Sequence, residues 1–130
     1  MAVFIDTSAA VKLVSAERES EALRQWLADL KPDVVSSELL RTELMRALHR
    51  HPLTSSEQAA PILDTIAMVT PTSIDFAKAG DLDPPELRSL DALHLAVALG
   101  LGDDVDSMLT YDHRLADAAE AHGLTVIAPR

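Results

Sequence analysis

The sequence predicts an α/β fold, in which a parallel β-sheet carries helices on both faces. Stretches rich in β-forming residues alternate along the whole chain with stretches of helical periodicity, which is the pattern of a parallel sheet whose strands are joined by helices. The first strand, Val3 to Ile5, is an unbroken apolar run. Such a run is typical of a strand in the middle of the sheet, where both faces are buried.

The composition fits one domain, residues 1–130, with an aliphatic core. Hydrophobic residues make up 48% of the 130-residue chain and aromatic residues only 3%, so we expect a core of Leu, Val, Ile and Ala in a chain long enough to bury it. No apolar run approaches the ~20 residues of a membrane span, and the early first strand leaves no room for a signal peptide. We therefore expect a soluble, cytoplasmic protein.

Cysteine content and charge limit the chemistry. The chain has no cysteine, which excludes disulfides, thiolate metal sites and cysteine nucleophiles. Its net charge of −10 argues against a protein that binds nucleic acid by general electrostatic attraction. The charge does not argue against an enzyme that meets phosphates through bound cations. Most of the basic residues are arginines, which suit bidentate phosphate contacts.

In the first half of the chain, Asp6 ends the first strand, and Thr7 and Ser8 are good N-cap residues for the helix that follows. Asp6 itself either caps this helix or binds a ligand, because ligands bind at the carboxyl ends of strands in open α/β sheets. Val34 and Val35 form the second strand. Apolar residues at helical spacing predict the helices of this half, which cover residues 9–14, 19–30 and 38–50.

The third helix carries a carboxylate within or beside its apolar stripe. Glu43 lies three residues after Leu40 and four before Ala47, so it shares their side of the helix. A buried carboxylate is unfavourable unless it is paired or bound to a metal. Either Arg46 or Arg50 pairs with Glu43 at the edge of the stripe, or Glu43 belongs to a functional site.

The middle of the chain is predicted from caps and breakers. Thr54 and Glu57 form a T-x-x-E capping box that opens a fourth helix. Pro61 lies inside that helix and is expected to kink it. Residues 68–70 form a third strand.

The fifth and sixth helices differ in their expected burial. A short fifth helix, Ser73 to Ala79, is expected to stop at Gly80. Ser89 is expected to cap the sixth helix, residues 90–99. Because the sixth helix is apolar nearly all round, it should be buried.

Two polar residues interrupt this apolar helix. Asp91 lies in its first turn, where a carboxylate is favoured by the helix dipole but can also serve a site. His94 follows one turn later. The pair is either an Asp-x-x-His metal ligand set or, as is commoner for a histidine in an apolar helix, a core histidine with one hydrogen bond.

The last part of the chain repeats the motif of a strand followed by an acid. Residues 107–110 form a fourth strand, Asp112 comes directly after it, and a helix covers 113–121. Residues 125–127 form the last strand.

Four acids therefore occupy positions that favour a common site. If the first and fourth strands are neighbours, Asp6 and Asp112 share one edge of the sheet, and Asp91 at the start of the sixth helix can face them. Without neutralisation such a cluster, with Glu43, would repel itself. Mg²⁺ and Mn²⁺ prefer carboxylate oxygens and water, and such ions activate water and stabilise in-line displacement at phosphorus.

Four segments carry a resemblance that extends over nearly the whole chain, and their order and spacing make it specific: residues 4–9, 37–44, 87–96 and 109–116. The third, Leu87-Arg88-Ser89-Leu90-Asp91-Ala92-Leu93-His94-Leu95-Ala96, is the most specific. Together they resemble the PIN-domain ribonucleases, specifically the VapC-type toxins of bacterial type II toxin–antitoxin pairs.

The resemblance implies a PIN-like three-layer α/β/α fold with a five-stranded parallel sheet in the order 3-2-1-4-5. It also implies Mg²⁺- or Mn²⁺-dependent endonucleolytic cleavage of RNA. Thr7 and Thr110 match positions where a hydroxyl supports the metal site, and His94 has no implied role in metal binding. Tyr111 departs from the usual Asn or small residue, and it either narrows the cleft or stacks on a base. The acidic quartet of the family falls on Asp6, Glu43, Asp91 and Asp112.

The resemblance also suggests roles for the four acids. Asp6 and Asp91 hold the ion directly, and Asp112 completes the site or acts from its outer shell. Glu43 orients or deprotonates the attacking water, or holds a second ion. Four arginines close in sequence to these acids are candidate contacts for RNA phosphates: Arg41, Arg46, Arg88 and Arg114.

The toxin resemblance implies a cognate antitoxin as partner, with a DNA-binding end and a tail that covers the acidic cleft. The net charge of −10 favours a basic or Arg-bearing tail, and the first four helices are expected to form its groove. A homodimer is also expected.

Two alternatives remain: another Mg²⁺-binding α/β domain, or a non-catalytic interaction module with this fold. A receiver domain needs an Asp at the end of the third strand and a late Lys, but Val69-Thr70-Pro71 ends that strand and no Lys follows Lys78. An Asp-x-Asp phosphatase is opposed by Ser8. Retention of all four acids argues against the non-catalytic module.

Overall fold

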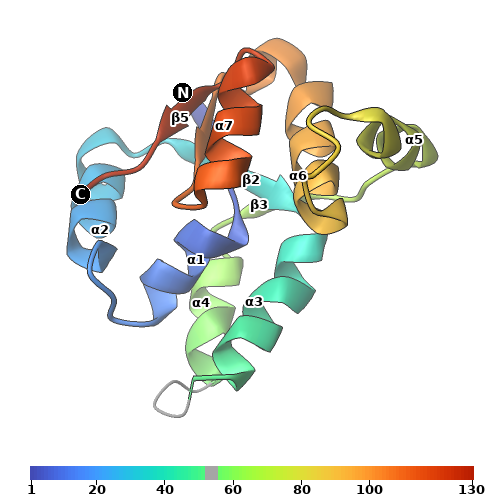
Figure 1. Ribbon diagram of the computed structural model, residues 1–130. Coiled ribbons are helices and arrows are strands. Elements are labelled where there is room, and N and C mark those ends of the chain that lie inside the picture. The colour runs from blue at the N-terminus through green and yellow to red at the C-terminus, as the bar shows by residue number, and fades with distance from the viewer. Residues whose placement is uncertain (52–55) are drawn as a thin grey trace.

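The computed structural model describes residues 1–51 and 56–130 and contains a five-stranded parallel sheet (Figure 1). The order β3-β2-β1-β4-β5 confirms the predicted topology. The predicted capping box at Thr54 lies outside the described residues. The strands are β1 (Ala2–Ile5), β2 (Asp33–Ser37), β3 (Ala67–Val69), β4 (Ser107–Leu109) and β5 (Thr125–Ile127).

The central strand β1 divides the core into two halves. Phe4 pairs with Val35 of β2 and Met108 of β4. Because successive side chains of a strand point to opposite faces, Val3 and Ile5 pack into one apolar cluster and Phe4 into the other. All three are fully buried, which confirms the prediction of a central strand that is covered on both faces.

Helices cover both faces of the sheet and complete the three-layer α/β/α fold (Figure 1). The first face carries α1 (Thr7–Val14), α2 (Ser20–Leu30), α3 (Leu39–His49) and α4 (Ala59–Leu63). The second carries α6 (Ser89–Gly100) and α7 (His113–Ala121), and α5 (Ser73–Asp81) packs against α6. Two short 3₁₀ helices, η1 (Ser56–Gln58) and η2 (Gly102–Asp104), complete the described elements. None of the helices in the described ranges has the length and apolar character to cross a membrane.

Two predicted helix starts were wrong. Helix α1 begins at Thr7, and Asp6 is its N-cap because the Asp6 carboxylate accepts a hydrogen bond from the Ala9 N–H. Helix α6 begins at Ser89 itself. The residue before it, Arg88, takes the N-cap position with an extended backbone and no side-chain cap bond.

Two predicted helix breakers do not act as expected. Helix α5 continues through Gly80 to Asp81. A helical glycine costs only about 1 kcal/mol, and a capping box between Thr72 and Asp75, together with packing against α6, favours the helix. Pro61 lies in the first turn of the short helix α4, where its missing N–H needs no partner, rather than inside a longer, kinked helix.

Candidate active site

The four predicted acids meet at one cleft of about 530 Å³ at the carboxyl edge of the sheet. They come from four places in the fold: the ends of β1 and β4, the middle of α3 and the first turn of α6. The cleft is lined by Asp6, Thr7, Ser8, Glu43, Arg50, Arg88, Ser89, Leu90, Asp91 and Asp112. The predicted meeting of strand ends and the start of α6 is therefore confirmed in the geometry.

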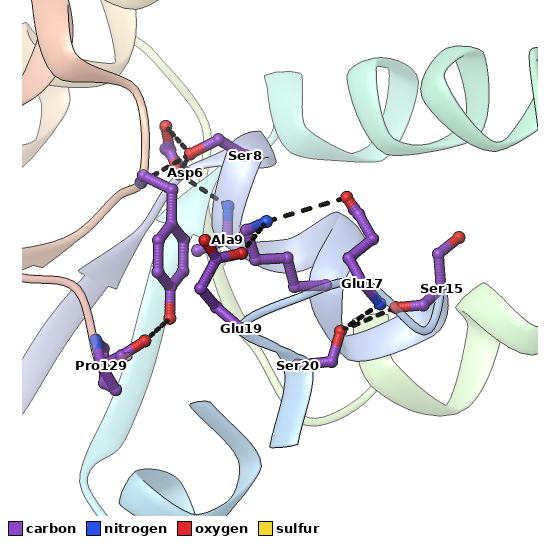
Figure 2. A network of polar contacts seen from close by, with 10 residues as sticks. Asp6, Ser8, Ala9, Ser15, Glu17, Glu19, Ser20 and Pro129 are labelled. Atoms are coloured by element: carbon purple, nitrogen blue, oxygen red, sulfur yellow. Dashed lines mark hydrogen bonds and ion pairs between the residues drawn. The ribbon is translucent and has the colours of Figure 1, made fainter. Parts of the chain in front are cut away.

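Asp6 is the most buried of these acids, with only 3% of its surface exposed. Its Oδ1 accepts hydrogen bonds from the Ala9 N–H (3.0 Å) and the Ser8 hydroxyl (2.7 Å) (Figure 2). Its Oδ2 accepts one from the Thr110 hydroxyl (2.7 Å). Burial raises the pKa of Asp6 from 3.8 to about 6, although these hydrogen bonds oppose the shift. Asp6 is thus both a helix cap and a cleft carboxylate.

Ser8, in the first turn of α1, connects the chain after β1 with the segment after β4 and is not among the site residues predicted from the sequence. Its hydroxyl oxygen accepts a hydrogen bond from the Tyr111 N–H (2.9 Å), while Thr110 Oγ1 accepts one from the Asp112 N–H (3.1 Å). These bonds hold the segment of Asp112 against the segment of Asp6. The position of Ser8, two residues beyond a strand-ending acid, is the available signal, but the sequence predicts for Ser8 a helix cap and no role in the site.

Glu43 extends from α3 and is held through a single oxygen. Its Oε1 accepts a hydrogen bond from the Thr7 hydroxyl (2.9 Å) and a short one from His94 Nε2. Neither Arg46 nor Arg50 forms an ion pair with it among the described residues, so that alternative was wrong. Burial raises the pKa of Glu43, but the bond and charge of His94, aided by Thr7, outweigh burial and leave the pKa below its ordinary value.

His94 has two polar partners, not the single one expected of a core histidine. Its Nε2 contacts Glu43, and its Nδ1 lies 3.0 Å from the Ser37 hydroxyl oxygen. The ring is 1% exposed and meets the Phe4 ring edge-on, with centroids 5.8 Å apart. Because both ring nitrogens are engaged by protein groups, neither has a free lone pair directed at an ion.

The other two acids, Asp91 and Asp112, are half-buried and both line the cleft. Burial, followed by the negative charges of Asp112 and Glu43, raises the pKa of Asp91 above its ordinary value. Asp112 is the N-cap of α7, and its Oδ1 accepts hydrogen bonds from the N–H groups of Arg114 (2.9 Å) and Leu115 (3.1 Å). The carboxylates therefore repel one another, as the sequence predicted for an unneutralised cluster.

Only part of the predicted arginine set reaches these acids. Arg88 lines the main cleft and, with Arg114, an adjoining hollow of about 290 Å³. Arg41 forms an exposed ion pair with Glu38 (2.8 Å), and Arg46 lines neither hollow. Arg50 lines the main cleft but was not predicted as a phosphate contact, although its spacing of seven residues from Glu43 places it on the same helical face.

Tyr111 lies beside the C-terminal segment and does not line the cleft. Its hydroxyl donates a hydrogen bond to the Pro129 carbonyl (2.8 Å), and Lys12 Nζ lies 4.9 Å from its ring centroid. Lys12 also pairs with Glu19 (2.7 Å), which stands in the same network as Pro129 in Figure 2. This position favours neither of the two roles expected for Tyr111, and it ties the chain end to α1.

The donor set of the cleft suits a hard divalent cation. It offers carboxylate oxygens, which Mg²⁺ and Mn²⁺ prefer, and the repulsion that raises the pKa of Asp91 is the kind that a cation relieves. Among the described residues, no three acidic or histidine side chains form a ready-made cage. Mg²⁺ usually binds through one or two carboxylates and keeps several waters, so the site fits an ion held partly by water.

Comparison with known proteins identifies the family. The profile of the PIN domain matches residues 3–121. The ribonuclease VapC46 of Mycobacterium tuberculosis is 43% identical over 128 residues, which cover 98% of each chain.

Solved structures share the fold at low sequence identity. The crystal structure of M. tuberculosis VapC20, described as a toxin that cleaves the sarcin–ricin loop, has a TM-score of 0.76 at 20% identity and covers 98% of this chain and 99% of its own. A toxin–antitoxin complex from Klebsiella pneumoniae has a TM-score of 0.73 at 20% identity, with 98% of each chain covered.

Proposed function

Since the chain belongs to the PIN-domain family, we propose that it is a Mg²⁺- or Mn²⁺-dependent endoribonuclease and the toxin of a toxin–antitoxin pair. The observation that carries the proposal is the convergence of Asp6, Glu43, Asp91 and Asp112 on one cleft. A relative that is 43% identical along nearly its full length is a VapC ribonuclease. Full-length similarity at this level supports the same activity for this chain.

Each acid has a role that its environment supports. Asp6, Asp91 and Asp112 would hold the cation, which would supply Lewis-acid stabilisation of the phosphate and a more acidic water. Glu43 is ionised at neutral pH because its pKa is lowered, so it accepts a proton or a hydrogen bond from the attacking water. Thr7 holds the Glu43 carboxylate through Oε1.

Substrate phosphates contact the arginines that reach the acids. Arg88 stands between the two hollows, Arg50 lies in the main cleft and Arg114 lies in the adjoining one. Because the net charge is −10, attraction of RNA depends on these local groups and on the cation, and not on the protein as a whole.

The partner is a cognate antitoxin. The Klebsiella pneumoniae neighbour is a toxin–antitoxin complex, and the acidic cleft of this chain suits a basic or Arg-bearing segment by charge complementarity. Such a segment would occupy the cleft in place of the cation and the RNA. The chain itself is proposed to form a homodimer.

The test is RNA cleavage by the purified protein with Mg²⁺, with Mn²⁺ and with EDTA. Wild type should cut RNA with either metal and stop with EDTA, and Glu43→Gln should lose activity. Asp103→Asn is the matched control, because Asp103 is exposed and outside the cleft lining. Intact RNA under every metal condition, together with antitoxin binding, would instead identify a non-catalytic interaction module.

A further inference from the structure

We infer that His94, anchored by Ser37, is a positioning residue that orients the Glu43 carboxylate for the reaction. The inference rests on the proposed function, because it concerns how one of the four acids is held. It assigns a role to two buried residues that lie outside the acidic quartet.

Ser37, His94 and Glu43 form a continuous polar chain from the sheet to the cleft. Ser37 ends β2, His94 lies in the middle of α6 and Glu43 comes from α3. The Ser37 hydroxyl lies 3.0 Å from His94 Nδ1, and His94 Nε2 contacts Glu43 Oε1. Three elements that are distant in sequence are therefore joined at a single imidazole.

The imidazole ring has little freedom to move. It is 1% exposed, and the Phe4 ring packs against it at an interplanar angle of 70°. A side chain fixed by packing and by two polar partners holds its own partner precisely in place, which an exposed histidine would not do.

The contacts of Glu43 leave one oxygen for chemistry. Oε1 accepts hydrogen bonds from both Thr7 and His94, whereas Oε2 accepts none from the described residues. An ionised carboxylate has only acceptor sites, so His94 Nε2 must carry a proton and donate it. The Ser37 hydroxyl oxygen accepts the Leu39 N–H (3.3 Å) and lies 3.0 Å from Nδ1 at the other side of the ring.

A purely structural role predicts a different pattern of mutant effects. If His94 only fills the core, each substitution of it should lower the cleavage rate in proportion to the stability that the protein loses. A positioning residue instead affects cleavage according to which of its two hydrogen bonds survives, and misplacement by about 1 Å can cost about 100-fold in rate.

Two amide substitutions separate these readings. In His94→Gln the amide nitrogen lies near the position of Nε2 and can still donate to Glu43. In His94→Asn it lies near Nδ1 and reaches only Ser37. We expect His94→Gln to keep most of kcat, and His94→Asn to lose about 100-fold in kcat with little change in KM, at similar melting temperatures.

Neighbouring serines on β2 supply a second, matched pair. Ser36 and Ser37 are both fully buried, but the Ser36 hydroxyl donates to the Ile5 carbonyl (2.7 Å) and takes no part in the chain to Glu43. Both variants, Ser37→Ala and Ser36→Ala, should lower the melting temperature to a similar degree. Ser37→Ala should also lower kcat, whereas Ser36→Ala should leave kcat unchanged.

Proton NMR without metal gives a readout that does not depend on activity. The proton on His94 Nε2 should resonate far downfield, persist in Asp103→Asn and shift or vanish in Glu43→Gln. Absence of this resonance from wild type would overturn the inference, as would equal cleavage by the Gln and Asn variants of His94. Failure of wild type to cleave RNA overturns the proposed function as well, so the two failures are distinguishable.

Discussion

Asp6 is a carboxyl group that the folded chain makes harder to ionise. Its pKa is about 6 in the folded protein against an ordinary 3.8, because burial outweighs its hydrogen bonds. Between about pH 4 and pH 6 the folded state therefore binds this proton more tightly than the unfolded state does. Ionisation of Asp6 consequently removes about 3 kcal/mol of stability from the metal-free protein as pH rises through that window.

We predict that this loss is visible in the difference between wild type and Asp6→Asn. Asn keeps the shape and cannot ionise, so its free energy of unfolding should lack this falling component. Urea unfolding in EDTA at several pH values between about 4 and 7 measures both proteins. Parallel pH profiles for the two would show that the pKa of Asp6 is not raised in the folded state.

Thr110, after Ser8, supports the ionised form of Asp6 through a side-chain hydrogen bond. It is 1% exposed, and its hydroxyl donates to Asp6 Oδ2 at 2.7 Å. We predict that Thr110→Val destabilises the protein by about 1.5–3 kcal/mol at neutral pH, the usual value of a hydrogen bond to a charged group. The loss should be smaller near pH 5, where Asp6 is mostly protonated.

The control for this prediction is Thr125→Val. Thr125 lies on the edge strand β5 and is exposed, so the same change of side chain there should have little effect on stability. Equal losses for Thr110→Val at both pH values would indicate that the hydroxyl contributes through packing and not through the charge of Asp6.

At the scale of elements, two effects act in opposite directions on the ionised carboxylate of Asp91 in the first turn of α6. The helix dipole favours a negative charge there by about 0.3–1 kcal/mol. Burial and the charges of Asp112 and Glu43 disfavour it, and they dominate, because the pKa of Asp91 is raised. Without a metal ion, the charge of Asp91 therefore destabilises the folded protein at this end of α6.

We predict that Asp91→Asn melts at a higher temperature than wild type in EDTA. Asn removes the repelling charge and keeps the shape and one acceptor oxygen. With Mg²⁺ the order should narrow or reverse, because the variant has lost a proposed ligand, and RNA cleavage should fall to background. If Asp91 served only the helix dipole, the variant would be no more stable than wild type, Mg²⁺ would shift both alike, and cleavage would survive.

Local sequence patterns predicted the elements better than they predicted the contacts of the site. Apolar runs of β-forming residues located the five strands, and helical spacing located the helices between them. The family resemblance supplied the order of the strands in the sheet. The helix boundaries predicted from Gly80 and Ser89 were wrong, because the preference of a single residue, about 1 kcal/mol, is outweighed by packing and by capping elsewhere. The structure decides such boundaries at the level of the whole helix.

The four acids were predictable because each occupies a recognisable position at a strand end or on a helix face. The partners of His94 were not predictable in this way. Its contacts with Glu43 and Ser37 span 51 and 57 residues, and no local periodicity encodes contacts of that range. The packing of α6 against β2, and the approach of α3 to α6 at the contact between His94 and Glu43, bring the three side chains together.

At the scale of the whole molecule, the net charge of −10 and the acidic cleft act in the same direction. A large net charge of one sign destabilises the compact state by self-repulsion, and the cleft concentrates that repulsion among its four carboxylates. A cation in the cleft would relieve it where it is strongest. Protons and the cation should therefore compete for the same oxygens.

We predict that the stabilisation by Mg²⁺ grows with pH. Asp6 and Asp91, whose pKa values are raised, must lose their protons before they bind the ion, so occupancy at a fixed, subsaturating Mg²⁺ concentration should rise between about pH 5 and pH 8. The stabilisation follows RT ln(1 + [L]/Kd), about 2.7 kcal/mol when the ion is in hundredfold excess over Kd. Cleavage of RNA should rise over the same range.

The measurement is the difference in melting temperature between Mg²⁺ and EDTA samples at each pH, with the cleavage rate beside it. The gap should widen for wild type because deprotonation weakens the metal-free protein and strengthens ion binding at the same carboxylates. For Asp91→Asn, which has one fewer titrating ligand, the difference in melting temperature between Mg²⁺ and EDTA should be smaller and should change less with pH. A gap that is constant with pH, or cleavage that is flat from about pH 5 to pH 9, would mean that these carboxylates do not exchange protons for the ion.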